Sequence, residues 1–135
     1  MRSEIHSVMT DATRRPRILI VESQKTIARI ISLMLSSKRY CCEIVATGDE
    51  AVDVALKTRP DLILTEIKLD GEIDGITVCE QIKAIADIPV IFISVCGEKE
   101  IVERANRCNP CGYIRVLKNP LIEQLSRLAG TKSGN

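Results

Sequence analysis

The sequence predicts an α/β fold in which helices cover both faces of an open parallel sheet. Three observations support this prediction. Five short apolar runs recur along the chain, and such runs suit strands that are buried on both faces. Segments with apolar residues at helical spacing separate them. Five strand–helix units are too few to close an eight-stranded barrel, so the sheet is expected to stay open.

Each strand is predicted from apolar residues without helical spacing. The strands are expected at residues 18–21, 40–46, 62–66, 90–94 and 113–117. The third strand ends on Thr65 and Glu66, and a charged loop that contains glycine follows it. Pro89 directly precedes the fourth. Short strands joined by helical crossovers indicate parallel pairing throughout.

Each helix is predicted from apolar residues spaced three and four apart. The helices are expected at residues 27–35, 51–56, 76–86, 98–107 and 120–129. Ser23 is predicted to be the N-cap of the first helix. Pro60 prevents the second helix from continuing. Asn119 and Pro120 have the residue types of an N-cap and a first helical residue, and Gly130 is expected to end the last helix.

Length and charge restrict the classes of function. The 135 residues are expected to form one domain at 16–130, between a flexible tail at 1–15 and a tail at 131–135. The 19 basic and 18 acidic residues nearly cancel, which argues against nucleic-acid or membrane partners. The sequence has no apolar run near the roughly 18 residues of a membrane span, and its first residues lack a signal-peptide pattern. We therefore expect a cytoplasmic protein.

Polar residues at the strand ends are the first candidate site. The flavodoxin-like strand order 2-1-3-4-5 fits best, and it places the binding crevice between the first and third strands. Glu22 and Glu66 end these two strands, and Ser94 ends the fourth. Two converging carboxylates suit Mg²⁺. The competing interpretation is that both acids are solvated and that Ser23 only caps a helix.

The six cysteines give a second candidate site. A long chain rich in Ile, Val and Leu and without an export signal favours reduced thiols that pack as small apolar residues, and Cys41, Cys42 and Cys79 are interpreted in this way. Cys108 and Cys111 have the C-x-x-C spacing of redox and metal sites. Two cysteines supply only half of a tetrahedral zinc site, so thiols at tolerant positions remain the simpler interpretation.

Several segments resemble the receiver domain of the two-component response-regulator (CheY-like) family, in the family's order and over about residues 17–129. The segments are ILIVES (18–23), GDEAVDVAL (48–56), PDLILTEIKLDGEIDGI (60–76), IPVIFIS (88–94), and CGYI with the downstream NP (111–120). The resemblance implies a signalling module, not an enzyme. It also implies that a sensor histidine kinase transfers a phosphoryl group to an aspartate at the end of the third strand.

The resemblance assigns roles to individual positions. Glu66 stands at the phosphoacceptor position, and Glu22 and Ser23 stand where an acidic pair helps to hold Mg²⁺. Ser94 matches the hydroxyl that contacts the phosphoryl oxygens, and Tyr113 matches the aromatic switch. The site that this implies therefore contains two possible metal ligands, Glu22 and Glu66.

Three of these positions depart from the family's pattern. Glutamate at position 66 moves the carboxylate outward, Ser23 replaces the second acid, and Val116 stands where a lysine is expected. In an alternative register, Lys118 supplies that charge through a local bulge. Phosphoryl transfer depends on exact positioning and on charge stabilisation. We therefore expect a degenerate receiver, or pseudo-receiver, that binds Mg²⁺ weakly and works through protein–protein interaction.

Alternatives remain open within this interpretation. Glu66 either mimics the phosphorylated state by reaching Ser94 or a backbone amide, or points to solvent. The domain could still accept a phosphoryl group, on Glu66 or on Ser94. The expected partners are a sensor histidine kinase or another signalling protein, and a second copy bound through the fourth helix, fifth strand and last helix. The third hypothesis is a redox or metal module that uses Cys108 and Cys111.

Overall fold

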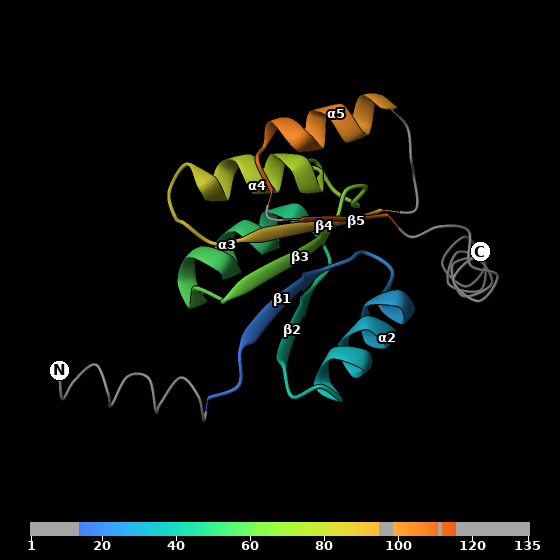
Figure 1. The fold of residues 1–135 in the computed structure, drawn as a ribbon, viewed down its shortest axis with the longest axis vertical. Coiled ribbons are helices and arrows are strands. Elements are labelled where there is room, and N and C mark those ends of the chain that lie inside the picture. Colours follow the sequence, from blue (N-terminus) through green and yellow to red (C-terminus); the bar gives the residue numbers. More distant parts are fainter. Residues whose placement is uncertain (1–13, 95–98, 111, 116–135) are drawn as a thin grey trace, which may run out of the picture.

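The computed structural model describes residues 14–94, 99–110 and 112–115. Five parallel strands form one sheet in the order β2-β1-β3-β4-β5 (Figure 1). Their bounds are β1 Arg17–Val21, β2 Cys41–Val45, β3 Leu62–Glu66, β4 Val90–Ser94 and β5 Gly112–Arg115. This arrangement confirms the predicted fold class and strand order. The predicted last helix and the tail at 131–135 lie outside the described residues.

Helices cover both faces of the sheet. Figure 1 shows α2 on one face and the other helices on the opposite face. Their bounds are α2 Lys25–Ser36, α3 Gly48–Thr58, α4 Gly75–Lys83 and α5 Lys99–Arg107. None of these described helices is long and apolar enough to cross a membrane.

The core consists of two apolar clusters, one on each face of the sheet. Successive residues of β1 contribute to opposite clusters, as the two-residue period of a strand requires. Leu19 and Val21 belong to the larger cluster with residues of α3, α4 and α5, whereas Ile18 and Ile20 belong to the smaller one. Burial on both faces explains why residues 18–21 of β1 are continuously apolar instead of alternating.

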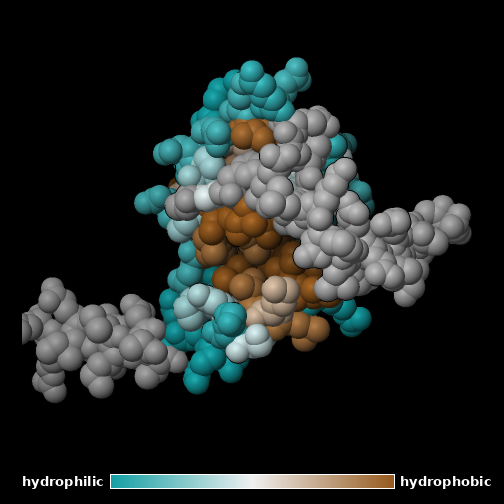
Figure 2. Space-filling model, turned by 45° about the vertical axis from the view of Figure 1, so that its right-hand side comes forward, coloured by the Kyte–Doolittle hydropathy of each residue, from teal (hydrophilic) through white to brown (hydrophobic). Residues whose placement is uncertain are grey.

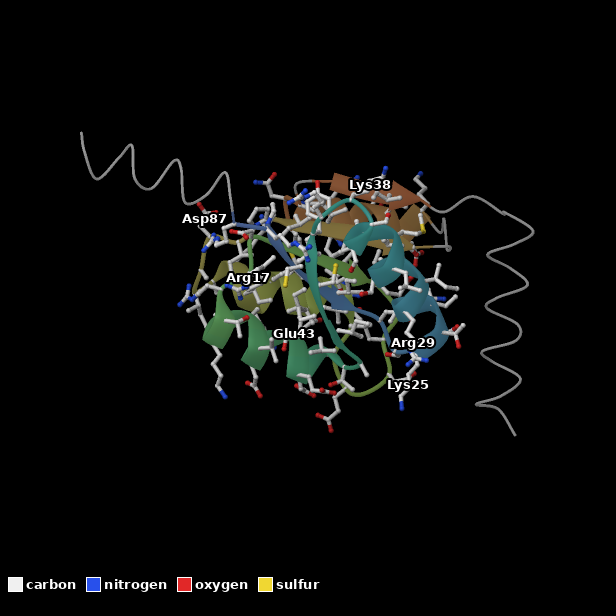
Figure 3. All side chains as sticks on the ribbon, turned by 90° about the horizontal axis from the view of Figure 1, so that it is seen from below. Arg17, Lys25, Arg29, Lys38, Glu43 and Asp87 are labelled. Atoms are coloured by element: carbon white, nitrogen blue, oxygen red, sulfur yellow. The ribbon has the colours of Figure 1, made fainter. Side chains whose placement is uncertain are left out.

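The face covered by α2 keeps apolar surface exposed. Figure 2 shows a broad hydrophobic area on this side of the molecule. Leu33 and Met34 of α2 and Ile114 of β5 are among the exposed large apolar side chains. Charged side chains occupy the periphery, and Figure 3 shows Lys25 and Arg29 extending outward from α2.

The helix ends correct one prediction. Ser23 is not the N-cap of α2, since Gln24 takes that position without a side-chain hydrogen bond. The Ser23 hydroxyl instead bonds across the fold, as described below. Thr47 caps α3, because its Oγ1 accepts a hydrogen bond from the Glu50 amide at 3.3 Å.

The described cysteines are free thiols in three kinds of surroundings. Cys79 is completely buried, which confirms the prediction that it packs in the core, and Cys42 is partly buried against the smaller cluster. Cys41 is exposed, so the prediction that it packs in the interior was wrong. It lies on the edge strand β2, where only one neighbouring strand covers the backbone. Cys111 lies outside the described residues.

Candidate functional site

The strand ends bring Glu22, Glu66 and Ser94 to one edge of the sheet. The register pairs Val21 of β1 with Thr65 of β3, and Glu66 of β3 with Ile93 of β4. Glu22 and Ser94 each follow one of these paired residues, so the backbone ladder places both beside Glu66. Glu22 is 8% exposed and Ser94 is 1% exposed. The three polar groups therefore lie at the margin of the core, not in free solvent.

Glu66 is held by hydrogen bonds on the inner side of this edge. Its Oε1 accepts a bond from the Ile67 amide at 3.0 Å. Burial is the largest influence on its acidity and the charge of Glu22 is the second, and together they raise the pKa of Glu66 to about 7. Hydrogen bonds from the amides of Ile67 and Lys68 and from the Ser94 hydroxyl oppose this rise. Glu66 thus reaches both a backbone amide and Ser94.

Glu22 is the second carboxylate of the site. Its Oε2 accepts a hydrogen bond from the Gln24 amide at 3.0 Å, at the beginning of α2. Burial raises the pKa of Glu22, and the charge of Asp70 adds to the rise, while the amides of Gln24 and Ser23 oppose it. Glu22 is buried and Glu66 is partly buried, and the charge of Glu22 disfavours ionisation of Glu66. A proton or a cation would relieve this repulsion.

Ser23 connects three segments of the site. Its hydroxyl donates to the carbonyl oxygen of Ala46 at 2.6 Å, just after β2, and accepts from the amide of Asp70 at 2.8 Å. Asp70 lies in the loop between β3 and α4, and its charge acts on Glu22. Asp70 is not among the site residues that the sequence pattern predicts. The available signal was an acidic residue in the loop that follows the strand of Glu66.

A close backbone approach fixes the start of α4 below Glu66. The Gly75 amide donates to the Ile67 carbonyl at 2.8 Å. A Cβ atom at position 75 would collide with the carbonyl oxygen of Glu66. The Thr65 hydroxyl donates to that same oxygen at 2.9 Å. Glycine is therefore required where the loop returns to the sheet.

The remaining predicted site residues are described less completely. Tyr113 lies on β5, where it pairs with Phe92 of β4, and only its backbone is described. Val116 and Lys118 lie outside the described residues. Among the residues that are described, Asp, Glu, His and Cys side chains nowhere gather in a group of three or more that would hold a metal ion. Within that part, cation binding would depend on the oxygens of Glu22 and Glu66 together with non-acidic ligands or water.

Comparison with known proteins identifies the family. Residues 18–124 match the family described as the response regulator receiver domain. This match covers most of the chain, and the chain belongs to that family, whose members are signalling modules of two-component systems.

Individual relatives agree with this assignment. The chain is 34% identical over 89 residues to the transcriptional regulatory protein ResD of Bacillus subtilis, covering 66% of this chain and 37% of ResD. It is 34% identical over 79 residues to the transcriptional regulatory protein BaeR of Escherichia coli, covering 58% of this chain and 32% of BaeR. The chain thus spans about a third of the length of these curated relatives.

Solved structures show the same fold. The signal receiver domain of a modulated diguanylate cyclase from Desulfovibrio desulfuricans superposes with a TM-score of 0.71 and 31% identity, covering 88% of this chain and 96% of that one. The signal receiver domain of a histidine kinase from Syntrophus aciditrophicus gives a TM-score of 0.70 and 31% identity, covering 86% and 91%.

Proposed function

We propose that this receiver domain has a degenerate phosphorylation site and signals through protein–protein contacts without phosphotransfer to an aspartate. The observation that carries the proposal is the position of Glu66. It ends β3, where the resemblance places the phosphoacceptor, and it already bonds to the Ile67 amide and to Ser94. The Ser94 hydroxyl, which the resemblance assigns to the phosphoryl oxygens, thus has a side-chain partner within the chain.

This contact favours the idea that Glu66 acts as a built-in substitute for the phosphoryl group. Its longer side chain allows the carboxylate to reach Ser94, as a phosphoryl group on a shorter aspartate would. The pKa of about 7 means that the substitute loses much of its negative charge when the pH falls below neutral. The proposed active-like state is therefore strongest in mildly alkaline solution.

Mg²⁺ would be held weakly by this site. The carboxylates of Glu22 and Glu66 are the hard oxygen ligands that this ion prefers, and each already disfavours the other's negative charge. A bound divalent cation would supply the positive charge that offsets this repulsion. Ser23 contributes a hydroxyl in place of a second acid, and this hydroxyl already bonds to Ala46 and Asp70.

The proposed partners follow from the family. Receiver domains interact with histidine kinases and other signalling proteins. We infer that this one meets a cytoplasmic kinase or effector and forms a homodimer through the face of α5, β5 and the segment after it. Exposed Lys99, Glu103 and Arg107 of α5 supply mixed charges at that face.

A phosphorylation assay tests the proposal. The full chain is incubated with Mg²⁺ and acetyl phosphate, and its intact mass is then measured. The wild-type chain is expected to gain no phosphate mass. Phosphate on Glu66 or Ser94 would contradict the proposal and support the alternative of a phosphoryl-accepting receiver, and peptide mapping would identify which residue carries it.

A restored variant is the matched control. The triple change Glu66→Asp, Ser23→Asp and Val116→Lys supplies the shorter acceptor, the second metal ligand and the missing cation. This variant is expected to gain one acid-stable, base-labile phosphate and to bind Mg²⁺ about tenfold more tightly, since an added carboxylate ligand strengthens binding. Failure of a folded triple variant to accept phosphate would show that the loss has another cause.

A further inference from the structure

Two thiols from different helices meet on the face of the sheet that carries α4 and α5. Cys79 is in α4 and is completely buried, and Cys108 directly follows α5 and is partly buried. Cys108 packs against the large apolar cluster that includes Cys79. Its Sγ lies 3.7 Å from the carbonyl oxygen of Ile76, about one turn before Cys79 on α4. The Cys79 thiol is close enough to hydrogen bond with Cys108.

We propose that Cys79 and Cys108 are a redox pair, which closes to a disulfide between α4 and the end of α5. This pairing differs from the C-x-x-C pair of Cys108 and Cys111 that sequence spacing suggests. The fold brings Cys79 next to Cys108, although the two residues are 29 positions apart in the sequence (108 minus 79).

The chemistry balances with hydrogen peroxide as oxidant. The Cys108 sulfur attacks the peroxide O–O bond and becomes a sulfenic acid, and the departing oxygen leaves as water after it takes up a proton. The Cys79 sulfur then attacks the Cys108 sulfur while its thiol proton passes to the departing oxygen, the S–O bond breaks, and a second water leaves. Two electrons pass from the two thiols to the peroxide.

The surroundings assign different roles to the two sulfurs. Burial raises the pKa of Cys79 to about 12, so it stays protonated and donates to Cys108. The pKa of Cys108 is also raised, by burial first and by the charge of Glu80, although the Cys79 hydrogen bond, Arg104 and Lys83 oppose the rise. Cys108 is the more exposed of the two thiols, so the oxidant reaches it first and Cys79 is the resolving group.

A disulfide here would change how firmly α5 is attached. Ala105 is the buried residue of α5. Polar contacts of this region with α4 include the pair of Arg104 with Asp74 at 2.7 Å and the bond from Lys83 to the Asn109 carbonyl at 2.7 Å. A covalent bond at Cys108 would reinforce this polar attachment, on the face proposed above for partner binding.

Mass spectrometry of the full chain tests the pair. The protein is treated with hydrogen peroxide, free thiols are blocked with N-ethylmaleimide, and peptides are mapped without reduction. The expected product is a peptide pair that joins Cys79 to Cys108 and disappears after reduction. A link from Cys108 to Cys111, or no intramolecular link, would overturn the proposal.

Variants separate the roles of the thiols. Cys79→Ala is expected to let Cys108 reach a sulfenic acid that dimedone traps, whereas Cys108→Ala removes both products. Cys41→Ala, on an exposed thiol, is expected to leave the link intact and serves as the control. Circular dichroism checks that each variant folds.

The rate of disulfide formation provides a measurement that does not depend on the variants. The wild-type rate is expected to rise about tenfold from about pH 7 to about pH 8, because the thiolate is the reacting form. A rate independent of pH would contradict attack by Cys108.

Discussion

The strand-end site and the contact between α4 and α5 are built in different ways. Glu22, Glu66 and Ser94 are brought together by the backbone ladder of β1, β3 and β4, which holds whatever side chains stand there. The contact between α4 and α5 depends on side chains, including the Arg104–Asp74 ion pair and the two thiols.

This difference bears on the proposal that this receiver has lost phosphotransfer while it keeps its fold. Where the backbone ladder fixes the position of a residue, glutamate can replace the family's aspartate without moving the strand. A contact made by side chains changes with every substitution in it. We therefore expect the largest effects where the backbone is crowded and smaller ones where single side chains connect elements.

Substitution of Gly75 tests the close backbone approach at the strand-end site, and we expect its effect to be the largest. Gly75→Ala places a Cβ against the carbonyl oxygen of Glu66 and should displace the start of α4. We expect a loss of about 3 kcal/mol in the free energy of unfolding, measured by urea denaturation. Gly112→Ala is the control, since its Cβ would meet Ile91 at an ordinary 3.5 Å. Equal stability of the two variants would show that the approach at Gly75 is not rigid.

The pH dependence of stability tests the buried charge of the strand-end site. The pKa of Glu66 rises from its ordinary 4.5 to about 7 on folding. The folded chain therefore keeps a proton that the unfolded chain has lost, and stability falls by about 2 kcal/mol as the pH rises through this window.

Glutamine at position 66 cannot ionise, so Glu66→Gln should remove this fall of stability with pH. Relative to the wild type, the free energy of unfolding of the variant is expected to rise by about 2 kcal/mol between about pH 5 and about pH 8. Urea denaturation at each pH measures this difference. Parallel pH profiles for the two proteins would mean that Glu66 is not the group responsible.

Asp74 tests the contact between α4 and α5. Its carboxylate caps α4 by accepting from the Thr77 amide at 2.8 Å, and it also binds Arg104. Asp74→Ala removes both interactions, and we expect a loss of about 1.5 kcal/mol at neutral pH, measured by urea denaturation. Asp74→Asn keeps an oxygen for the cap and should lose only about 0.5 kcal/mol.

The lowered pKa of Asp74 leads us to expect a loss of stability in acid. Burial alone would raise the pKa of Asp74, but the hydrogen bonds from Thr77 and the contact with Arg104 outweigh it and lower the pKa. The stabilisation is therefore present above its ordinary value of 3.8 and lost as the pH falls through the folded pKa. An Asp74→Ala variant with the wild-type acid profile would contradict this assignment.

Ser23→Ala is expected to have a smaller effect than Asp74→Ala. It removes the bonds to the Ala46 carbonyl and the Asp70 amide, at a cost of about 1 kcal/mol. Ser37→Ala is the control, because the exposed Ser37 hydroxyl bonds only to Met34, within its own helix end. Thermal melts of the two variants should differ by a few degrees, and coincident melts would show that Ser23 does not hold the loop.

The strands and their order, which depend on the backbone, could be predicted from the sequence. The apolar run of 18–21 predicted β1, and the strand order then placed Glu22 next to the end of β3. The prediction that Ser23 caps α2 was wrong, because helix-capping rules consider only neighbours along the chain. The actual partners of Ser23 are 23 and 47 residues away. The approach of Cys79 to Cys108 escaped prediction for the same reason, since helix periodicity predicts that Cys79 is buried but does not indicate its neighbour.

The raised pKa of Glu66 also affects the charge that the whole molecule shows to an electric field. The formal net charge of +1 counts Glu66 as ionised. A carboxyl with a pKa of about 7 is about half protonated at neutral pH, so the folded chain carries about half a unit more positive charge than that count gives. Native and denatured forms should therefore separate on isoelectric focusing, and Glu66→Gln should bring the two bands closer together.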